Sequence, residues 1–344
     1  MRAHFAAGLA TLALAALVSD VRAQSDTSDP NKTIAENLLA LPGTSALAGL
    51  LKTEAFLPLV KQLNGTDQYT VFAPSNSALA SVDTTDPNLL TALVSYHVLG
   101  AQVKSTDLKA YQVNQTLLTD DKYTTLPSGE GQALVITSSN GNVNVTSGKP
   151  DDPAKVTQAD LTANNGVVHV IDQLLNFPGP LSKVAPAIAD ISTFTQLVKG
   201  ASGLVGALEE SRGVTIFAPN NAALSGVDTS SLNATTLADI LKFHVINGTV
   251  IYSPQIQDTT QVQTVQGGSI VANRSADNKV YIQNFEVVRP DILLENGVLH
   301  IINGVMMPNT AVKGSASATS DAARHSVVSA AFLLAAVPYL YLTL

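Results

Sequence analysis

The stretch Thr70-Val-Phe-Ala-Pro-Ser-Asn-Ser-Ala-Leu79 decides the fold, because it returns 145 residues later as Thr215-Ile-Phe-Ala-Pro-Asn-Asn-Ala-Ala-Leu224. In each copy a β-branched and aromatic run ends at a proline, which is typical of a short buried strand. Ser75 and Asn220 follow the two prolines, and their side-chain oxygens can cap a helix. The stretch therefore predicts a strand followed directly by a capped helix, at two places in the chain.

Two more blocks repeat in the same order. Leu93–Gly100 (LVSYHVLG) corresponds to Ile240–Asn247 (ILKFHVIN), and Asn165–Asp172 (NGVVHVID) corresponds to Asn296–Asn303 (NGVLHIIN). The first pair of blocks has the apolar spacing of a helix, and the Asn-Gly dipeptides predict hairpin turns. Because the offsets are 147 and 131 residues, the repeated units are whole domains and not the turns of a solenoid.

These elements predict an α+β fold with two tandem domains. The prolines and the glycine of Phe177–Pro180 resist regular structure, so we expect the join there. The expected first domain is 33–178, the linker is 179–183 and the second domain is 184–308. Each domain is long enough to bury its own core.

Composition excludes several classes of protein. The 344 residues include 19 Lys+Arg against 27 Asp+Glu, for a net charge of −8, and the basic residues form no cluster along the chain. Nucleic-acid binding depends on neutralising phosphates, so we expect no nucleic-acid partner. The absence of cysteine from the sequence excludes a disulfide scaffold, a thiolate zinc site and a cysteine nucleophile.

Both ends of the chain have the features of processing signals. Residues 1–23 start with the basic Arg2, continue as an uncharged apolar run and end in small residues, as a secretory signal peptide does. The small or polar segment 309–326 precedes an uncharged apolar tail at 327–344, which is typical of a GPI-attachment signal that is removed. The candidate attachment residues are Gly314, Ser315 and Ser317. A transmembrane anchor is the alternative, and both interpretations predict the extracellular face of the plasma membrane, or the cell wall, as the location.

Asn-X-Ser/Thr triplets agree with passage through the secretory pathway. Candidate N-glycosylation sites are Asn31, Asn64, Asn114, Asn144, Asn233, Asn247 and Asn273. Most of them stand beside residues that favour surface turns, so we expect glycans at several of the seven.

The three repeated blocks together resemble the fasciclin (FAS1) family. Its features are the T-[VI]-F-A-P-x-[ND] box, the central Tyr/Phe-His pair and the NGV-[VL]-H-[VI]-I box, and the resemblance spans about 33–177 and 184–308. The resemblance implies that each domain is a wedge or sandwich of β-strands with several helices. It also implies a secreted or membrane-anchored adhesion or matrix protein. Because the chain lacks Pro/Ala/Ser/Thr-rich tracts, it is more similar to fungal surface proteins than to the plant arabinogalactan type.

The same resemblance supplies candidate adhesion residues. In the family, the Tyr-His pair and an Asp-Ile dipeptide before the last box are tied to receptor adhesion. The matching positions are Tyr96, His97, Asp160, Leu161, Phe243, His244, Asp291 and Ile292. Only the first copy has the tyrosine, and only the second has Asp-Ile. Helical spacing moreover predicts that His244 shares the buried face of Ile240 and Leu241, where no partner could reach it.

No catalytic motif accompanies the repeats. The sequence contains no HExxH pair, no Gly-x-Ser-x-Gly elbow and no phosphate loop. Matched histidines, His97 with His244 and His169 with His300, favour core imidazoles that are bonded to backbone carbonyls. We therefore expect no catalytic residue, no metal ligand and no cofactor.

The sequence predicts a non-catalytic cell-surface glycoprotein that acts in adhesion or in the organisation of the wall or matrix. The expected partners are surface or matrix glycoproteins, wall polysaccharide, or fasciclin domains of another copy, and the expected membrane attachment is a lipid anchor. A carrier of a small apolar ligand, held between helix and sheet, is one alternative. A secreted hydrolase is another.

Overall fold

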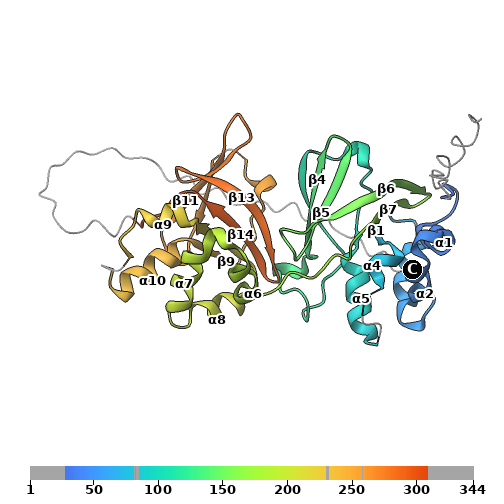
Figure 1. Ribbon diagram of the computed structural model, residues 1–344, viewed down its shortest axis with the longest axis horizontal. Helices are drawn as coiled ribbons and strands as arrows, with labels where there is room; N and C mark the ends of the chain where they lie inside the picture. Colours follow the sequence, from blue (N-terminus) through green and yellow to red (C-terminus); the bar gives the residue numbers. More distant parts are fainter. Residues whose placement is uncertain (1–27, 81, 83–84, 230–231, 258, 309–344) are drawn as a thin grey trace, which may run out of the picture. The chain divides into compact units, whose positions relative to one another are not determined.

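The computed structural model describes residues 28–80, 82, 85–229, 232–257 and 259–308 (Figure 1). The expected signal peptide at 1–23, the spacer at 309–326 and the apolar tail at 327–344 lie outside the described residues. The candidate attachment residues Gly314, Ser315 and Ser317 lie outside them as well.

The first repeat combines a group of short helices with a seven-stranded sheet. Its helices are α1 (Ile34–Ala40), α2 (Ser45–Leu51), α3 (Leu57–Leu63), α4 (Asn76–Leu79) and α5 (Pro87–Tyr96). Its strands are β1 (Tyr69–Pro74), β2 (Val98–Leu99), β3 (Tyr111–Gln115), β4 (Ala133–Ser139), β5 (Asn142–Thr146), β6 (Ala154–Ala163) and β7 (Gly166–Ile171). The strand order is β2-β1-β7-β6-β5-β4-β3, in which β1 and β7 run parallel and the other neighbours run antiparallel.

The second repeat has the same architecture. Its helices are α6 (Leu181–Val184), α7 (Ser192–Gly200), α8 (Leu204–Glu209), α9 (Asn221–Ser225) and α10 (Ala234–Phe243). Its strands are β8 (Val214–Pro219), β9 (Val245–Asn247), β10 (Thr260–Gln263), β11 (Ser269–Arg274), β12 (Val280–Ile282), β13 (Phe285–Leu294) and β14 (Gly297–Ile302). The order β10-β11-β12-β13-β14-β8-β9 is that of the first sheet, with β8 and β14 parallel. Leu181, inside the expected linker, is buried in this repeat's core.

The first repeated stretch forms the predicted strand and capped helix in both repeats. Strands β1 and β8 are buried along their whole lengths. Ser75 Oγ accepts a hydrogen bond from the Ala78 amide at 3.3 Å. Asn220 Oδ1 accepts one from the Ala223 amide at 2.7 Å. Both predicted caps are therefore confirmed, and each satisfies an amide that the helix itself leaves unpaired.

Hairpin turns precede β7 and β14, but they fall one residue earlier than the Asn-Gly dipeptides predict. In the first repeat Ala163 pairs with Gly166, so the two-residue loop is Asn164-Asn165. A Cβ atom on Gly166 would lie 2.0 Å from the carbonyl oxygen of Tyr69 in the neighbouring strand β1. The close approach of that strand and the φ of 146° at Gly166, rather than a place within the two-residue loop, therefore require the glycine.

The asparagine of each Asn-Gly dipeptide is buried, and its side chain bonds to backbone groups of neighbouring segments. Asn165 Nδ2 donates to the carbonyl oxygens of Leu63, at 2.7 Å, and Gly65, at 3.0 Å. Its Oδ1 accepts from the Ile34 amide at 2.9 Å. One side chain thus satisfies the start of α1 and the end of α3, and Asn296 is equally buried at the matching position.

All described helices are short. The longest, α5 and α10, have ten residues each. Within the described ranges, no single helix combines the length and apolar character that crossing a membrane requires. The pair formed by α1 and Pro42–Leu51 passes that test only when taken together, and it bends by 92° between its halves.

We predict that Gly297→Ala destabilises the second repeat, whereas Gly206→Ala does not. A Cβ at position 297 would lie 2.0 Å from the carbonyl oxygen of Val214, a backbone atom of the β8–β14 pairing. Such overpacking costs on the order of 1–3 kcal/mol. Gly206 lies in α8 with no atom within 4 Å of an added Cβ, and there alanine stabilises the helix. That gain is at most about 1 kcal/mol.

Urea unfolding of the two variants and the parent measures these changes directly. A Gly297→Ala protein with the stability of the parent would contradict the assignment of this glycine to close strand contact.

Candidate functional site

The central histidine closes the end of a helix in each repeat. His97 directly follows α5, and its Nδ1 lies 2.7 Å from the carbonyl oxygen of Leu93. Its Nε2 accepts a hydrogen bond from the Leu175 amide at 3.0 Å. Because Nε2 is an acceptor, the proton of the neutral ring lies on Nδ1. His97 is buried, so the predicted core position is confirmed.

His244 repeats this arrangement at the end of α10. Its Nδ1 lies 2.8 Å from the Ile240 carbonyl oxygen, and its Nε2 accepts from the Met306 amide at 2.9 Å. Desolvation lowers the pKa of His97 and of His244 to about 4, although the hydrogen bond to the backbone carbonyl opposes that shift. Both rings are therefore neutral at physiological pH, with both nitrogens engaged by backbone.

The remaining adhesion candidates are also enclosed. The Tyr96 hydroxyl donates to the Ala133 carbonyl oxygen at 3.0 Å, and the side chain has no exposed surface. Seven of the eight candidates are buried, namely Tyr96, His97, Leu161, Phe243, His244, Asp291 and Ile292. Asp160 is half-buried. A partner could not touch the seven buried side chains without displacing the elements that cover them.

Each candidate aspartate sits at a bulge, where it fastens a loop to the sheet. Asp160 and Asp291 have left-handed backbone conformations, with φ of 58° and 55°, which aspartate tolerates better than most residues. The carboxylate of Asp160 accepts from the Ser105 amide at 2.8 Å and from the Ser105 hydroxyl. Asp291 binds Ser253 in the same two ways, with the amide at 2.7 Å.

A histidine completes each bulge. The Asp291 amide donates to His300 Nδ1 at 3.2 Å, and His300 Nε2 donates to the Ile251 carbonyl oxygen at 2.9 Å. His300 Nδ1 lies 3.8 Å from an Asp291 carboxylate oxygen, but it is an acceptor there, so the contact is not an ion pair. His169 makes the corresponding bonds to Asp160 and Val103. Burial lowers the pKa of His169 and of His300 and keeps both rings neutral.

This group of serine, aspartate and histidine is not a catalytic triad. In a triad the histidine accepts the serine proton and the aspartate orients the histidine. Here the Ser253 hydroxyl donates to Asp291, while His300 Nε2 is bonded to a backbone carbonyl. The imidazole does not face the serine hydroxyl, so these three side chains lack the proton acceptor of a triad.

The described part of the chain groups no metal ligands, and between helix and sheet it offers little space for an apolar ligand. No three His, Asp or Glu side chains among the described residues could share a metal ion. A pocket between helix and sheet beside His97 holds about 20 Å³, and the one beside His244 holds about 10 Å³. Sites for small molecules measure roughly 300–1,000 Å³, so these two gaps are too small for a carried ligand.

Asp291 has a third partner, which comes from the first repeat. The Tyr111 hydroxyl, on β3, donates to Asp291 Oδ2 at 2.8 Å. Burial and the nearby carboxylate raise the pKa of Tyr111 well above its usual value, so the phenol stays protonated as a donor. Among the described residues Asp160 makes no corresponding bond to a tyrosine. The two candidate aspartates therefore differ in role, because Asp291 links the repeats.

An apolar cluster surrounds this hydrogen bond, and we call it the joint. Its buried members are Ala133, Val135, Tyr252, Leu293 and Val298, and the half-buried Tyr111, Val113 and Val250 pack against them. Gln132 Nε2 donates to the Leu294 carbonyl oxygen at 3.1 Å, and the Thr125 amide donates to the Glu295 carbonyl oxygen at 2.9 Å. Side chains and backbone of both repeats thus exclude water from the joint.

Matching hydrogen bonds align the joint with its counterparts in the other repeat. The Thr116 amide donates to the Gln132 carbonyl oxygen, as the Thr264 amide does to that of Gly268. On this alignment, six joint residues have polar counterparts in the other repeat. The pairs are Tyr111 with Thr259, Val113 with Gln261, Ala133 with Ser269, Val250 with Gln102, Tyr252 with Lys104, and Leu293 with Thr162. At these six positions apolar residues occur only where the repeats meet, whereas the joint residues Val135 and Val298 correspond to the valines Val271 and Val167. Sequence reasoning missed these residues, although the contrast between aligned copies was a signal that could have found them.

The candidate glycosylation sites fall into two groups. Four asparagines are exposed, namely Asn31, Asn64, Asn233 and Asn247. Three are half-buried on strands, namely Asn114, Asn144 and Asn273. Exposure makes the first group accessible to a glycan without any change of the fold.

Comparison with known proteins agrees with the repeated blocks. The family model described as the fasciclin domain matches residues 42–178 and 189–308. The chain is similar to the fasciclin-like arabinogalactan protein CTB11 of Cercospora beticola, with 29% identity over 73% of this chain and 70% of that protein. A fasciclin-like arabinogalactan protein of Arthroderma benhamiae is 26% identical over 75% of this chain and 58% of its own length. A FAS1 domain pair from the insect cell adhesion molecule Fasciclin I matches 78% of this chain and 99% of that chain, with 17% identity and a TM-score of 0.38.

We predict that His97→Ala and His244→Ala lower stability without abolishing adhesion by the molecules that remain folded. Each substitution leaves a buried amide and carbonyl unpaired and opens a small cavity, at a cost on the order of 1–3 kcal/mol. Melting temperature is compared with adhesion per folded molecule. An unchanged melt with lost adhesion would show that these histidines form a contact surface.

The pH dependence of stability gives the same histidines a second test. Their pKa is about 4 in the folded protein and about 6.5 when unfolded, so the unfolded state binds protons more readily. Their contribution is therefore complete above pH 6.5 and is lost as the pH falls through 4, by about 3 kcal/mol for each ring. Denaturant midpoints of the alanine variants should fall less steeply with acidification than that of the parent.

We also predict that Tyr111→Phe loosens the joint. The substitution keeps the ring and removes the hydrogen bond to the Asp291 carboxylate. A hydrogen bond to a charged group contributes roughly 1.5–3 kcal/mol to stability. Amide exchange at Ser253 and along β13 should then accelerate about tenfold. Tyr281→Phe, the same change on β12 outside the joint, serves as the control. Equal exchange rates in both variants would contradict a role for this hydroxyl in linking the repeats.

Proposed function

The chain belongs to the fasciclin family, and from that premise we propose that it is a non-catalytic cell-surface glycoprotein acting in adhesion or in wall or matrix organisation. The main observation in support of the proposal is the structural role of the four matched histidines. Their ring nitrogens are bonded to backbone atoms, so they are parts of the scaffold. A partner would then contact the outer surface of the two joined domains.

Two alternatives receive less support. A serine hydrolase of the triad type needs a serine whose proton is accepted by a histidine, whereas the serine beside Asp291 donates to the carboxylate and His300 Nε2 is bonded to a backbone carbonyl. A carrier of a small apolar ligand needs a large enclosed pocket between helix and sheet, whereas the pockets beside His97 and His244 have volumes of about 20 and 10 Å³. We therefore retain the non-catalytic surface role.

We extend the proposal to the processing and location of the chain. Residues 1–23 are proposed as a signal peptide, and the tail at 327–344 as a GPI signal that is replaced by a lipid anchor. The domains are proposed at 33–178 and 184–308, and α6, which begins at Leu181 inside the expected linker, packs with the second domain. The exposed asparagines are the proposed glycan sites, namely Asn31, Asn64, Asn233 and Asn247.

The proposed partners are wall polysaccharide, surface or matrix glycoproteins, or the fasciclin domains of a second copy. Relatives named fasciclin-like arabinogalactan proteins support a setting rich in polysaccharide. The polar residues found opposite the joint positions argue against a second copy that docks by repeating the joint. Contact through another part of the surface remains compatible with the proposal.

We predict that phosphatidylinositol-specific phospholipase C removes the protein from intact cells and reduces their adhesion together. The reason is that the proposed anchor carries the domains responsible for adhesion. Immunoblots of cells and medium, paired with a cell-adhesion assay, measure both effects, and cells lacking the protein are the control. Adhesion that persists after complete release would contradict the surface function. A protein that stays on cells from which the enzyme removes other anchored proteins would contradict the anchor.

A further inference from the structure

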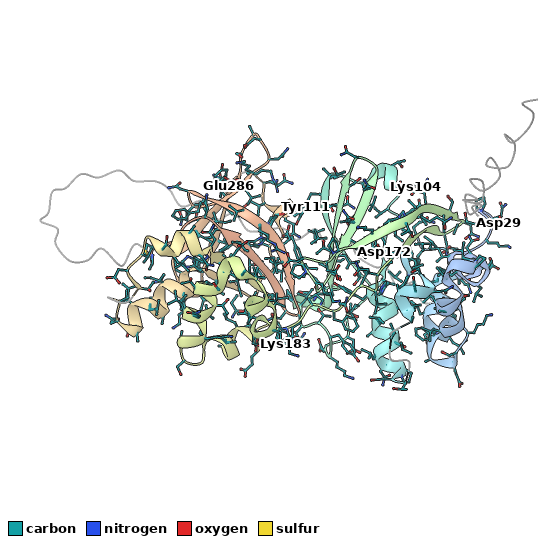
Figure 2. The ribbon with its side chains drawn as sticks, in the orientation of Figure 1. Asp29, Lys104, Tyr111, Asp172, Lys183 and Glu286 are labelled. Carbon is teal, nitrogen blue, oxygen red and sulfur yellow. The ribbon has the colours of Figure 1, made fainter. Side chains whose placement is uncertain are left out.

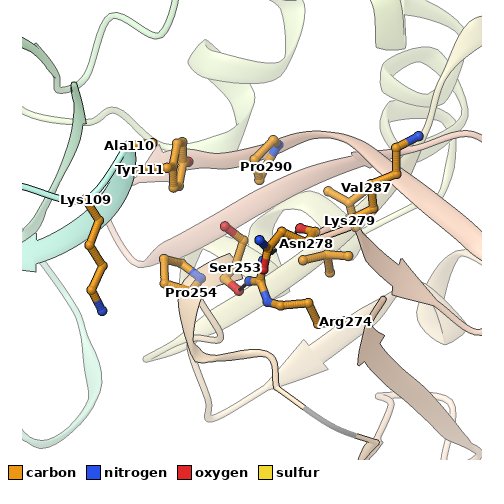
Figure 3. A pocket seen from close by; sticks show the side chains of 11 residues that line it. Lys109, Ala110, Tyr111, Ser253, Pro254, Arg274, Asn278, Lys279, Val287 and Pro290 are labelled. Atoms are coloured by element: carbon orange, nitrogen blue, oxygen red, sulfur yellow. Dashed lines mark hydrogen bonds between the residues drawn. The ribbon is translucent and has the colours of Figure 1, made fainter. Parts of the chain in front are cut away.

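A hollow of about 560 Å³ opens beside the joint. Figure 3 shows Lys109, just before β3, and Tyr111, the first residue of β3, on one side of it and Arg274, Asn278 and Pro290 of the second repeat on the other. Its volume is within the roughly 300–1,000 Å³ of small-ligand sites. Because both repeats supply its walls, the hollow exists only in the joined pair.

The charged side chains that line the hollow are all cationic. They are Lys109, Arg274 and Lys279, although the whole chain has a net charge of −8. Lys279 is paired with Glu286 at 2.8 Å. Among the described residues, no carboxylate forms an ion pair with Lys109 or Arg274. Lys109 and Arg274 thus have no ion-pair partner there, while the buried Asp291 carboxylate lies behind the lining residues Tyr111 and Ser253. Unpaired positive charges at the wall of a hollow attract anions.

The arginine is held in place by backbone. Arg274 Nε donates to the Ile256 carbonyl oxygen at 2.9 Å, and Nη1 donates to that of Asn278 at 2.9 Å. Nη2 donates to the Ser253 carbonyl oxygen. These carbonyls orient the guanidinium but do not neutralise its charge, so a fixed positive group faces the hollow before any ligand arrives. Pre-organisation of this kind lowers the cost of binding.

The other walls of the hollow suit a sugar better than a bare anion. The Tyr111 ring and Pro290 offer flat apolar faces, and Val280 and Val287 extend this lining. The exposed Asn278 supplies an amide that can exchange hydrogen bonds with hydroxyls. A sugar ring has apolar C–H faces and polar edges, and a uronate adds a carboxylate, whereas inorganic phosphate has no apolar face to pack.

We propose that this hollow binds an acidic oligosaccharide segment, with its carboxylate near Lys109 and Arg274 and a sugar face on Tyr111. The inference rests on the surface function proposed above and assigns it a ligand class and a place. Binding in the hollow also explains why one chain carries two joined repeats, since neither repeat alone has the complete set of contacts.

Calorimetric titration of the full-length protein in detergent with trigalacturonate tests the proposal. We expect binding that weakens as salt is raised, because its main attraction is between charges. Lys109→Glu should weaken it about tenfold or more. Lys104→Glu is the matched control, since it makes the same charge change on an exposed lysine that does not line the hollow. Figure 2 shows Lys104 and Tyr111 well apart. This control should retain the parent's affinity, and both variants should keep the parent's melting temperature.

Three results would overturn the proposal. One is the absence of trigalacturonate binding, and another is an equal loss of affinity in the two lysine variants. The third is equally tight binding of neutral maltotriose or of inorganic phosphate, which would indicate a hollow that recognises no acidic sugar. The phospholipase experiment separates this failure from failure of the surface function. Adhesion that depends on the anchored protein, without trigalacturonate binding, removes the ligand assignment and leaves the surface function standing.

Discussion

Parallel pairing of β1 with β7, and of β8 with β14, is the constraint on which the rest of each repeat depends. Thr70 lies opposite Val167 and Thr215 opposite Val298, so the pairing joins blocks from nearly opposite ends of each repeat. All four strands are buried along their lengths. A parallel pair needs a long crossover and cover on both faces, which the helices and the remaining strands provide.

The polar residues shared by the two copies solve problems that this buried pairing creates. Asn165 satisfies backbone groups at the ends of two helices, and His97 joins the end of α5 to the chain after β7. Asp160 fastens the loop at Ser105 to the bulge in β6. Buried backbone groups must find partners because water cannot reach them. These residues therefore occur in both copies because the fold needs them. The polar adhesion candidates are enclosed for the same reason, since they supply partners to buried backbone groups.

Residues that differ between the copies carry the information that is specific to the pair. Tyr111 meets Asp291 across the joint, whereas the position corresponding to Tyr111 in the second repeat is the exposed Thr259. Lys104, which corresponds to the buried Tyr252, is likewise exposed. Apolar side chains are favourable where they are covered and unfavourable where they face water. The pair is thus built for one joint, and the hollow beside that joint is the feature that a single repeat could not form.

The sequence by itself determined the two α+β repeats, the strand and cap of each first block and the inward position of the central histidines. These features follow from short-range spacing and from repetition, both of which are legible in a linear chain. Only the tertiary structure decided that Gly166 serves a neighbouring strand, that Asp291 but not Asp160 links the repeats, and that Lys109 and Arg274 share one hollow. The physical reason is distance along the chain. Tyr111 and Asp291 are 180 residues apart, and no local pattern encodes which side chains long-range packing will bring together.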